Sequence, residues 1–386
     1  MIPQENKRIK LVPVPELEAD HEDYFRVVED MIRNGGTLIP DPNWLMLVEG
    51  AKKVNDKQAG LDFALSEDAY RRQFSRMTNL MPAWIGASAA EAPSPHTVAR
   101  YRRFLEYGDP LDLWQSNVTQ RRSEIPMLQA DLGSIMDLNL LYIFADSSRR
   151  KMTRILEVGG GYGRLAEAAF NIFGRSIKYV LVDAVPGSLY YARSYLSHAC
   201  PEARIISYYD DGGYEGLDLD SDDFDIAVVP SWHFERINKS AYDICVNIES
   251  MQEMNQVHVD YYLRLFQSVA AEDAAIYISN ARDYYFRGTF NYPPNWRKLF
   301  ASNTPRSWKP CHPTEVFRKT NADCSMQNNI VDAAYNYGLW LQRDPAEFMS
   351  RNGCKDVIAP LSKGLVQALK WRWRGIFRPV SASEGT

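Results

Sequence analysis

The chain has 386 residues, of which 45% are hydrophobic and 24% charged, so it can bury a core for two domains without disulfides or metals. Its formal net charge is −5, whereas proteins that bind polyanions are usually basic, so we expect no nucleic-acid partner. Five scattered cysteines with no Cys-x-x-Cys pair indicate free thiols in a reducing compartment.

The first 150 residues are predicted to be mainly helical. Residues 1–16 are polar and lack an apolar signal core, and no apolar run reaches the roughly 18–20 residues of a membrane span, so we expect a cytoplasmic protein. Apolar residues recur at helical spacing in 24–32, 44–54, 61–77 and 97–107, with a loop at 86–95 and a helix at 135–145 that Ser134 could cap.

From Arg154 the pattern changes to short apolar runs that alternate with helical segments. Strands are expected at 155–158, 178–183, 204–208, 224–229, 243–246 and 274–279, and helices at 164–173, 187–198 and 258–270. The acidic, glycine-rich stretch 209–223 is expected to be a loop or a hairpin insertion. The alternation predicts an α/β, Rossmann-like fold, in which a doubly wound, mostly parallel sheet has helices on both faces.

Beyond Tyr284 the chain is interrupted by five prolines between residues 293 and 313, and we expect irregular structure there. Residues 365–379 are basic and aromatic at helical spacing. They could form a helix that packs on the domain or one that contacts an anionic membrane surface, and the sequence pattern fits both. We therefore divide the chain into a helical region (1–150), an α/β domain (151–345) and a C-terminal tail (346–386). The helical region is expected to cover a binding site on the α/β domain.

A glycine turn follows the first predicted strand. Residues 157–163 read Glu-Val-Gly-Gly-Gly-Tyr-Gly, between an apolar strand and a helix whose N-terminal amides point at the turn. Gly161-x-Gly163-x-x-Ala166 fits a relaxed dinucleotide fingerprint. Glu157, Gly159, Gly161 and Gly163 instead fill every place of the acidic-x-Gly-x-Gly-x-Gly turn of S-adenosylmethionine sites.

Charge favours the methyl donor over the dinucleotide. A carboxylate at Glu157 would repel a diphosphate, but it suits the ammonium and the sulfonium of S-adenosylmethionine. Asp183, at the end of the second strand, could accept hydrogen bonds from both ribose hydroxyls of either cofactor, or simply cap the next helix. Trp232 and Ser231 follow a later strand and could contact adenine, although Trp232 could equally belong to the core. The predicted donor site comprises Glu157, Gly159, Gly161, Gly163, Asp183, Ala184, Ser231, Trp232 and Asn247.

Methyl transfer to a hydroxyl also needs a base that removes the proton. Glu253 is the first candidate, followed by His258, His233 and His312. Ser250 and Glu253 also have capping-box spacing, which predicts a helix start. Ser250, Asn280, Arg282 and Tyr284 are the predicted acceptor contacts. Glu249, Glu253 and Asp260 could bind a divalent ion, but no spacing marks a metal site.

Several segments resemble the bacterial sugar O-methyltransferases associated with surface polysaccharide synthesis. The resemblance rests on RRSEIP (121–126), ILEVGGGYGRLA (155–166), VDAVP (182–186), DICVNIESMQEM (243–254) and YISNA (277–281), and covers roughly residues 110–285. It implies a class I methyltransferase fold and a sugar hydroxyl as the acceptor. Its most specific element is Asn-x-x-Ser-x-x-Glu-Met at 247–254, where Met251 replaces the aromatic residue that is frequent in the family.

Two other functions fit part of the pattern. An NAD-dependent enzyme acting on a nucleotide sugar would use the same turn, but the chain has no Tyr-x-x-x-Lys pair for hydride chemistry. A non-catalytic partner subunit would bind S-adenosylmethionine without turnover. The sequence does not specify the oligomeric state.

Overall fold

A computed structural model of the chain describes residues 12–13, 21–46, 56–73, 127–128, 134, 137–138, 140–141, 144, 154–208, 219–221, 223–236, 241–281, 289–302, 312–329 and 331–332. Several predictions lie outside these residues. They are the helix at 97–107, the loop at 86–95, most of the 209–223 insertion, the RRSEIP segment, Arg282, Tyr284 and the basic aromatic segment 365–379.

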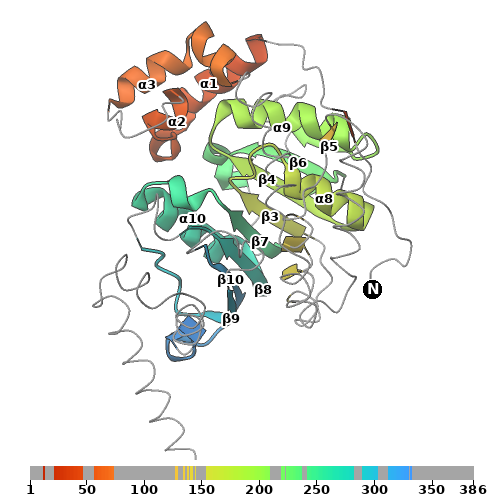
Figure 1. The fold of residues 1–386 in the computed structure, drawn as a ribbon, viewed down its shortest axis with the longest axis vertical. Helices are drawn as coiled ribbons and strands as arrows, with labels where there is room; N and C mark the ends of the chain where they lie inside the picture. Colours follow the sequence, from red (N-terminus) through yellow and green to blue (C-terminus); the bar gives the residue numbers. More distant parts are fainter. Residues whose placement is uncertain are drawn as a thin grey trace, which may run out of the picture.

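One sheet of eight strands forms the centre of the protein (Figure 1). Its order is β5 (Ile205–Ser207), β6 (Ile226–Pro230), β4 (Lys178–Asp183), β3 (Arg154–Val158), β7 (Tyr242–Ile248), β8 (Ala270–Ser279), β10 (Thr314–Lys319) and β9 (Trp296–Ser302). The pairs from β5 to β8 are parallel, and β10 is antiparallel to both of its neighbours. The predicted doubly wound, mostly parallel sheet is confirmed.

Helices cover both faces of this sheet. One core cluster joins β3, β4 and β6 to α8 (Arg164–Phe173) and α9 (Pro186–Ala199), and a second joins the other face to α10 (Gln256–Val269). The central strands are buried on both faces, which is why they read as continuous apolar runs rather than as alternating ones. The 3₁₀ turns η3 (Gly174–Ser176), η5 (Ser231–Arg236) and η6 (Met251–Glu253) complete this part.

The chain beyond Tyr284 is more regular than we expected. It contributes β9 and β10, whose ladder has a bulge between Val316 and Phe317. Trp296 on β9 is fully buried, and Lys298 on the same strand forms a buried ion pair with Glu315 at 2.7 Å. The prolines lie before and between the two strands, so they hid the strand pattern without preventing it.

The N-terminal helices are α1 (His21–Asn34), η1 (Gly36–Leu38), α2 (Pro42–Met46) and α3 (Lys57–Ala64), followed by a helical stretch at 67–73. The single helix predicted at 61–77 is wrong, because Leu65 and Ser66 interrupt it and the Ser66 hydroxyl accepts a hydrogen bond from the Ala69 amide. Ser134 is itself helical, and its hydroxyl accepts from Arg164 instead of capping.

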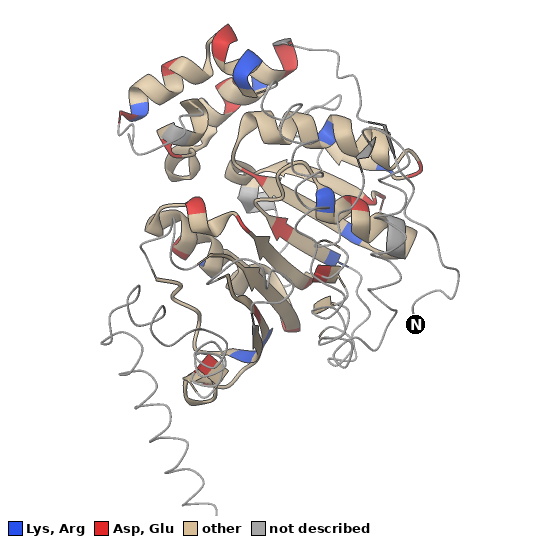
Figure 2. Cartoon of the chain, in the orientation of Figure 1, with Lys and Arg blue, Asp and Glu red and all other residues tan. Residues whose placement is uncertain are grey.

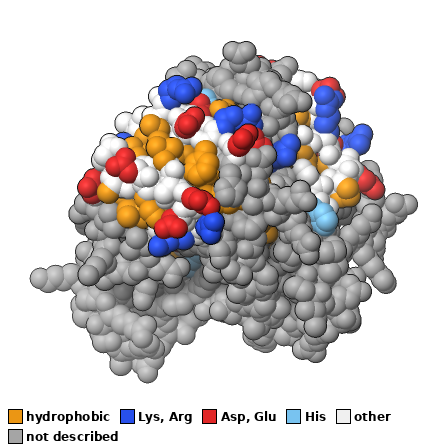
Figure 3. Space-filling view, turned by 90° about the horizontal axis from the view of Figure 1, so that it is seen from above, with side chains coloured by type: hydrophobic (Ala, Val, Ile, Leu, Met, Phe, Trp, Pro, Cys, Tyr) orange, Lys and Arg blue, Asp and Glu red, His pale blue; other side chains and the backbone are white. Residues whose placement is uncertain are grey.

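The N-terminal helices lie over α9, on one side of the sheet (Figure 1). Seen from above, their outer surface carries apolar side chains between acidic and basic ones (Figure 3). A short antiparallel pair, β1 (Val12–Pro13) with β2 (Met127–Leu128), is the remaining described element. Among the described residues, no helix has the length and apolar character needed to cross a membrane.

Candidate functional site

The carboxyl ends of β3, β4, β6, β7 and β8 meet at one edge of the sheet. Strand order reverses at β3, since the chain continues through β4 on one side and returns to β7 on the other. The crevice outside the strand ends at such a reversal is where doubly wound proteins bind ligands. The glycine turn leaves β3 at this point, and Asp183 ends the neighbouring strand β4.

Backbone geometry explains the glycines of the turn. Gly159, Gly161 and Gly163 have φ values of 73°, 56° and 92°, in the left-handed region that favours glycine. A Cβ on Gly159 would overlap the side chain of Ser250, and one on Gly163 would press into Leu196. Gly161 differs, because a Cβ built on it meets no atom of the described residues within 4 Å. The turn is therefore packed at both ends and open in the middle.

Asp183 holds the open part of the turn in place. Its Oδ2 accepts from the Gly161 amide at 3.0 Å, and its Oδ1 accepts from the Val185 amide at 2.9 Å. Burial raises the pKa of Asp183 to about 6, even though these amides favour its charged form. The Ala184 amide is a third backbone donor to this carboxylate, and one acceptor position of about four remains for a ligand hydroxyl.

Glu157, at the end of β3, lies beneath the glycine turn. Its side chain is buried, and its Oε2 is 3.0 Å from the position that a Cβ on Gly160 would take. The same oxygen accepts from the Tyr179 hydroxyl at 2.8 Å. Burial raises the pKa of Glu157 to about 7, with nearby Asp183 adding to the rise and Arg164 opposing it.

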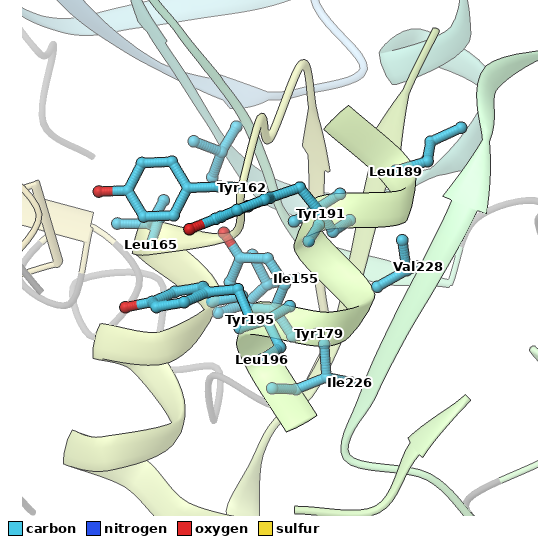
Figure 4. Close-up of a cluster of buried hydrophobic side chains, with 14 of the residues drawn as sticks. Ile155, Tyr162, Leu165, Tyr179, Leu189, Tyr191, Tyr195, Leu196, Ile226 and Val228 are labelled. Carbon is cyan, nitrogen blue, oxygen red and sulfur yellow. The ribbon is translucent and has the colours of Figure 1, made fainter. Parts of the chain in front are cut away.

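Tyr179, which bonds to Glu157, belongs to a cluster of buried tyrosines. Figure 4 shows Tyr162, Tyr179, Tyr191 and Tyr195 between α8, α9 and the sheet, among leucine, isoleucine and valine side chains. In the wider view, acidic residues fall on the strands of the sheet as well as on the outer helices (Figure 2). Glu157 and Asp183 are thus two buried carboxyl groups behind the open turn. Because burial makes their ionisation unfavourable, a bound cation nearby would lower the free energy needed to ionise them.

These pKa values predict an unusual pH dependence of stability. A carboxyl with a higher pKa in the folded protein keeps a proton that the unfolded chain has already lost. The ligand-free protein should therefore lose stability as pH rises from about 4 to about 7, with Glu157 contributing about 3 kcal/mol. Thermal unfolding at pH 5 and pH 8 should show a larger fall in Tm for wild type than for Glu157→Gln. Equal falls would contradict a buried, ionising Glu157.

Asn247 has a different role from the one we predicted. Its Nδ2 donates to the Val158 carbonyl at 2.8 Å and to Ser250 Oγ at 2.6 Å, while its Oδ1 accepts from Asn280 Nδ2 and from the Met251 amide. The side chain is fully buried and has used both donors and both lone pairs, so it has no capacity left for a cofactor.

Ser250 and Asn280 belong to the same network. Asn280 is buried, with its Oδ1 accepting from the Gln252 amide, and Ser250 packs against Gly159. The predicted acceptor contacts Ser250 and Asn280 thus join the ends of β3, β7 and β8 to each other. This network connects the strand ends that border the crevice.

The predicted adenine contact Trp232 and the candidate base His233 both bond to Asp30 on α1. The indole Nε1 donates to Asp30 Oδ2 at 2.5 Å, and His233 Nε2 is 2.6 Å from the same oxygen. Although burial opposes it, these bonds and one from Asn34 lower the pKa of Asp30 below its ordinary value. With Nε2 held by Asp30, His233 is not placed to act as the base. Ser231 is buried beside them.

The predicted capping box at Ser250 and Glu253 does not form. Residues 251–253 make only the short turn η6, the Ser250 side chain makes no cap bond, and α10 begins after Asn255, whose side chain accepts from the His258 amide. Glu253 is exposed in η6. His258 Nε2 is 2.6 Å from the Thr37 carbonyl, so this histidine also contacts the N-terminal helices.

Three predicted residues remain. Ala184 follows Asp183 and is half-buried, whereas Arg282 and Tyr284 lie outside the described residues. Within the described parts of the chain, no group of three or more His, Cys, Asp or Glu side chains could hold a metal ion.

Sequence reasoning missed Asp30, Thr37, Gln73 and Tyr179, because nothing local in the sequence marks a contact that spans 200 residues, such as the Asp30–Trp232 bond.

Comparison with known proteins gives likeness in structure only. No protein-family model and no curated relative matches the sequence. An S-adenosylmethionine-dependent methyltransferase from Aquifex aeolicus is 13% identical in sequence, with a TM-score of 0.29. The aligned part covers 44% of this chain and 82% of the Aquifex chain. An arsenic(III) S-adenosylmethionine methyltransferase from Chlamydomonas reinhardtii is 15% identical with a TM-score of 0.30, covering 45% and 64%. Likenesses of this size assign no function.

Proposed function

We propose that the chain is a methyltransferase that uses S-adenosylmethionine, with a sugar hydroxyl of a glycan or polysaccharide precursor as the acceptor. The observation that carries the donor assignment is the glycine turn, open at Gly161 and backed by the buried carboxyls of Glu157 and Asp183. A cationic amino-acid tail is complementary to this site, whereas a diphosphate would be repelled. The acceptor class is supported by the sequence resemblance described above.

Each part of the site would have one role. The turn from Gly159 to Gly163 would hold the methionine portion, and Asp183 would accept hydrogen bonds from the ribose. When bound, S-adenosylmethionine supplies an activated methyl group. The protein must then align the acceptor oxygen, keep water away from it and remove its proton.

We also infer that the N-terminal helices cover this edge of the sheet. Three hydrogen bonds tie them to residues that follow strand ends: Asp30 to Trp232, Thr37 to His258, and Gln73 to the Gly187 amide at 2.8 Å. All three meet the α/β domain near the carboxyl ends of β4, β6 and β7. This placement supports a cover over the bound donor and acceptor.

Calorimetric titration with S-adenosylhomocysteine and with NAD⁺ tests the donor assignment. Wild type should bind the former alone, and Asp183→Asn should weaken binding about tenfold by removing a charged acceptor. Asp323→Asn is the matched control and should leave affinity unchanged. Asp323 is exposed and follows β10 at the edge of the sheet opposite the glycine turn. Binding of NAD⁺ without S-adenosylhomocysteine would overturn the assignment.

Two further readouts use the same complex. Amide hydrogen exchange in residues 21–46 should slow when S-adenosylhomocysteine binds if the helices form a cover, and unchanged exchange would argue against it. Incubation with labelled S-adenosylmethionine and a panel of nucleotide sugars and glycans tests turnover. Donor binding with no transfer to any of them would favour the non-catalytic partner subunit.

A further inference from the structure

A carboxylate and an imidazole lie together at the edge of the sheet that carries the glycine turn. Glu249 is the first residue after β7, and its amide donates to the Ser279 carbonyl at the end of β8 at 2.8 Å. Its φ is 58°, a left-handed conformation that is uncommon outside glycine, asparagine and aspartate. Residues with a strained backbone of this kind are frequent at functional sites, so Glu249 is a candidate for a functional role.

Residues on both sides of Glu249 in the chain touch the end of β3. Asn247 donates to the Val158 carbonyl at 2.8 Å, and Ser250 occupies the space that a Cβ on Gly159 would need. Glu249 therefore lies between two contacts with the turn in which we place the methionine portion of the donor. The reversal of strand order brings it there from β7, on the far side of β3 from Asp183.

His312 stands behind this carboxylate. Its Nε2 is 3.8 Å from Glu249 Oε1, and the carbonyl of the next residue, Pro313, accepts from the Asn280 amide at 3.3 Å. The two side chains differ in exposure, 32% for Glu249 and 2% for His312. Glu249 is thus partly accessible to solvent, while His312 is buried next to it.

We propose that Glu249 is the base that takes the acceptor proton and that His312 is a positioning residue that orients this carboxylate. The proposal rests on the proposed function. A lone pair of the acceptor oxygen forms the new C–O bond, the C–S bond breaks with its electrons left on sulfur, and the hydroxyl proton passes to a Glu249 oxygen. The acid formed returns the proton to water after release. This moves the base from Glu253 to Glu249.

Proximity to the reacting atoms can be measured with two ligands that differ by one charge. S-adenosylmethionine carries a cationic sulfur, and S-adenosylhomocysteine carries a neutral one. NMR of protein with ¹³C-labelled histidine, with the His312 signal assigned from His312→Asn, gives the pKa of that ring in each complex. We expect it to be lower with S-adenosylmethionine by about 0.5 unit or more, since a cation within about 10 Å opposes protonation.

Variants test the pairing itself. Glu249→Gln should lower the pKa of His312 by about 1 unit by removing a charge at 3.8 Å, whereas Glu272→Gln on the opposite edge should leave it unchanged. With any acceptor that wild type methylates, Glu249→Gln should reduce kcat about 100-fold or more without changing affinity for S-adenosylhomocysteine. His312→Asn should shift the pH profile of kcat.

The outcomes separate the two proposals. If both ligands bind but the pKa of His312 is the same in the two complexes, the pair is remote from the sulfur and this inference is wrong while the donor site stands. If neither ligand binds, the donor assignment itself fails. Normal kcat in Glu249→Gln would also overturn the inference and return the role to Glu253.

Discussion

Gly161→Ala is expected to reduce affinity for S-adenosylhomocysteine about 100-fold or more while leaving the protein folded. Within the described parts of the chain the added methyl group meets no atom within 4 Å, so its steric cost falls on a ligand lying across the turn. A left-handed alanine at φ 56° costs about 1–2 kcal/mol of stability. The loss of affinity corresponds to about 2.8 kcal/mol, which calorimetric titration of the folded variant can measure directly.

Gly174→Ala is the matched control. Gly174 has a φ of 60° and also has open space at its Cβ position, but it follows α8 at the opposite edge of the sheet. Its ψ of −144° makes the backbone strain at least as large, so an effect of strain alone would appear there too. Wild-type affinity in Gly161→Ala would mean that no ligand approaches the open part of the turn.

Asn247→Ala is expected to lower the free energy of unfolding by about 3–5 kcal/mol. The substitution leaves the Val158 carbonyl, the Met251 amide and the Asn280 side chain buried without their partner, and each such group costs about 1–3 kcal/mol. Denaturant unfolding measures the loss. It should coincide with loss of S-adenosylhomocysteine binding, because the network aligns the ends of β3 and β7.

An exposed asparagine provides the comparison. Asn321→Ala removes one hydrogen bond to Glu272 at the surface and should change stability by less than about 1 kcal/mol. If Asn247→Ala were equally mild, the network would not organise the crevice, and Asn247 would again be open to the ligand role that its sequence position suggested.

The central fold could be predicted because its signals are local. The helix at Arg164–Phe173 and the strand at Lys178–Asp183 have the predicted bounds, since apolar runs buried on both faces and a glycine turn leave few alternatives. Asp183 and the glycines were found for the same reason. Strands β9 and β10 were missed because the prolines around them outweighed their short alternating patterns.

Side-chain roles that depend on distant partners could not be predicted. Asn247 and Asn280 look like ligand contacts in the sequence, and only the meeting of three strand ends shows that they bond to each other. His233 and His258 look like bases until Asp30 and Thr37 are placed against them. Glu249 was visible only as one of several acids, since its left-handed backbone is a property of the fold.

The central claim is that a buried carboxyl under the glycine turn balances the positive charge of the donor. Its most direct measurement is the number of protons released when S-adenosylhomocysteine binds at pH 7, from calorimetry in two buffers of different protonation enthalpy. With the pKa of Glu157 near 7, the ligand's ammonium should drive off about half a proton, and Glu157→Gln should release none. Proton uptake, or equal release from both proteins, would contradict the account.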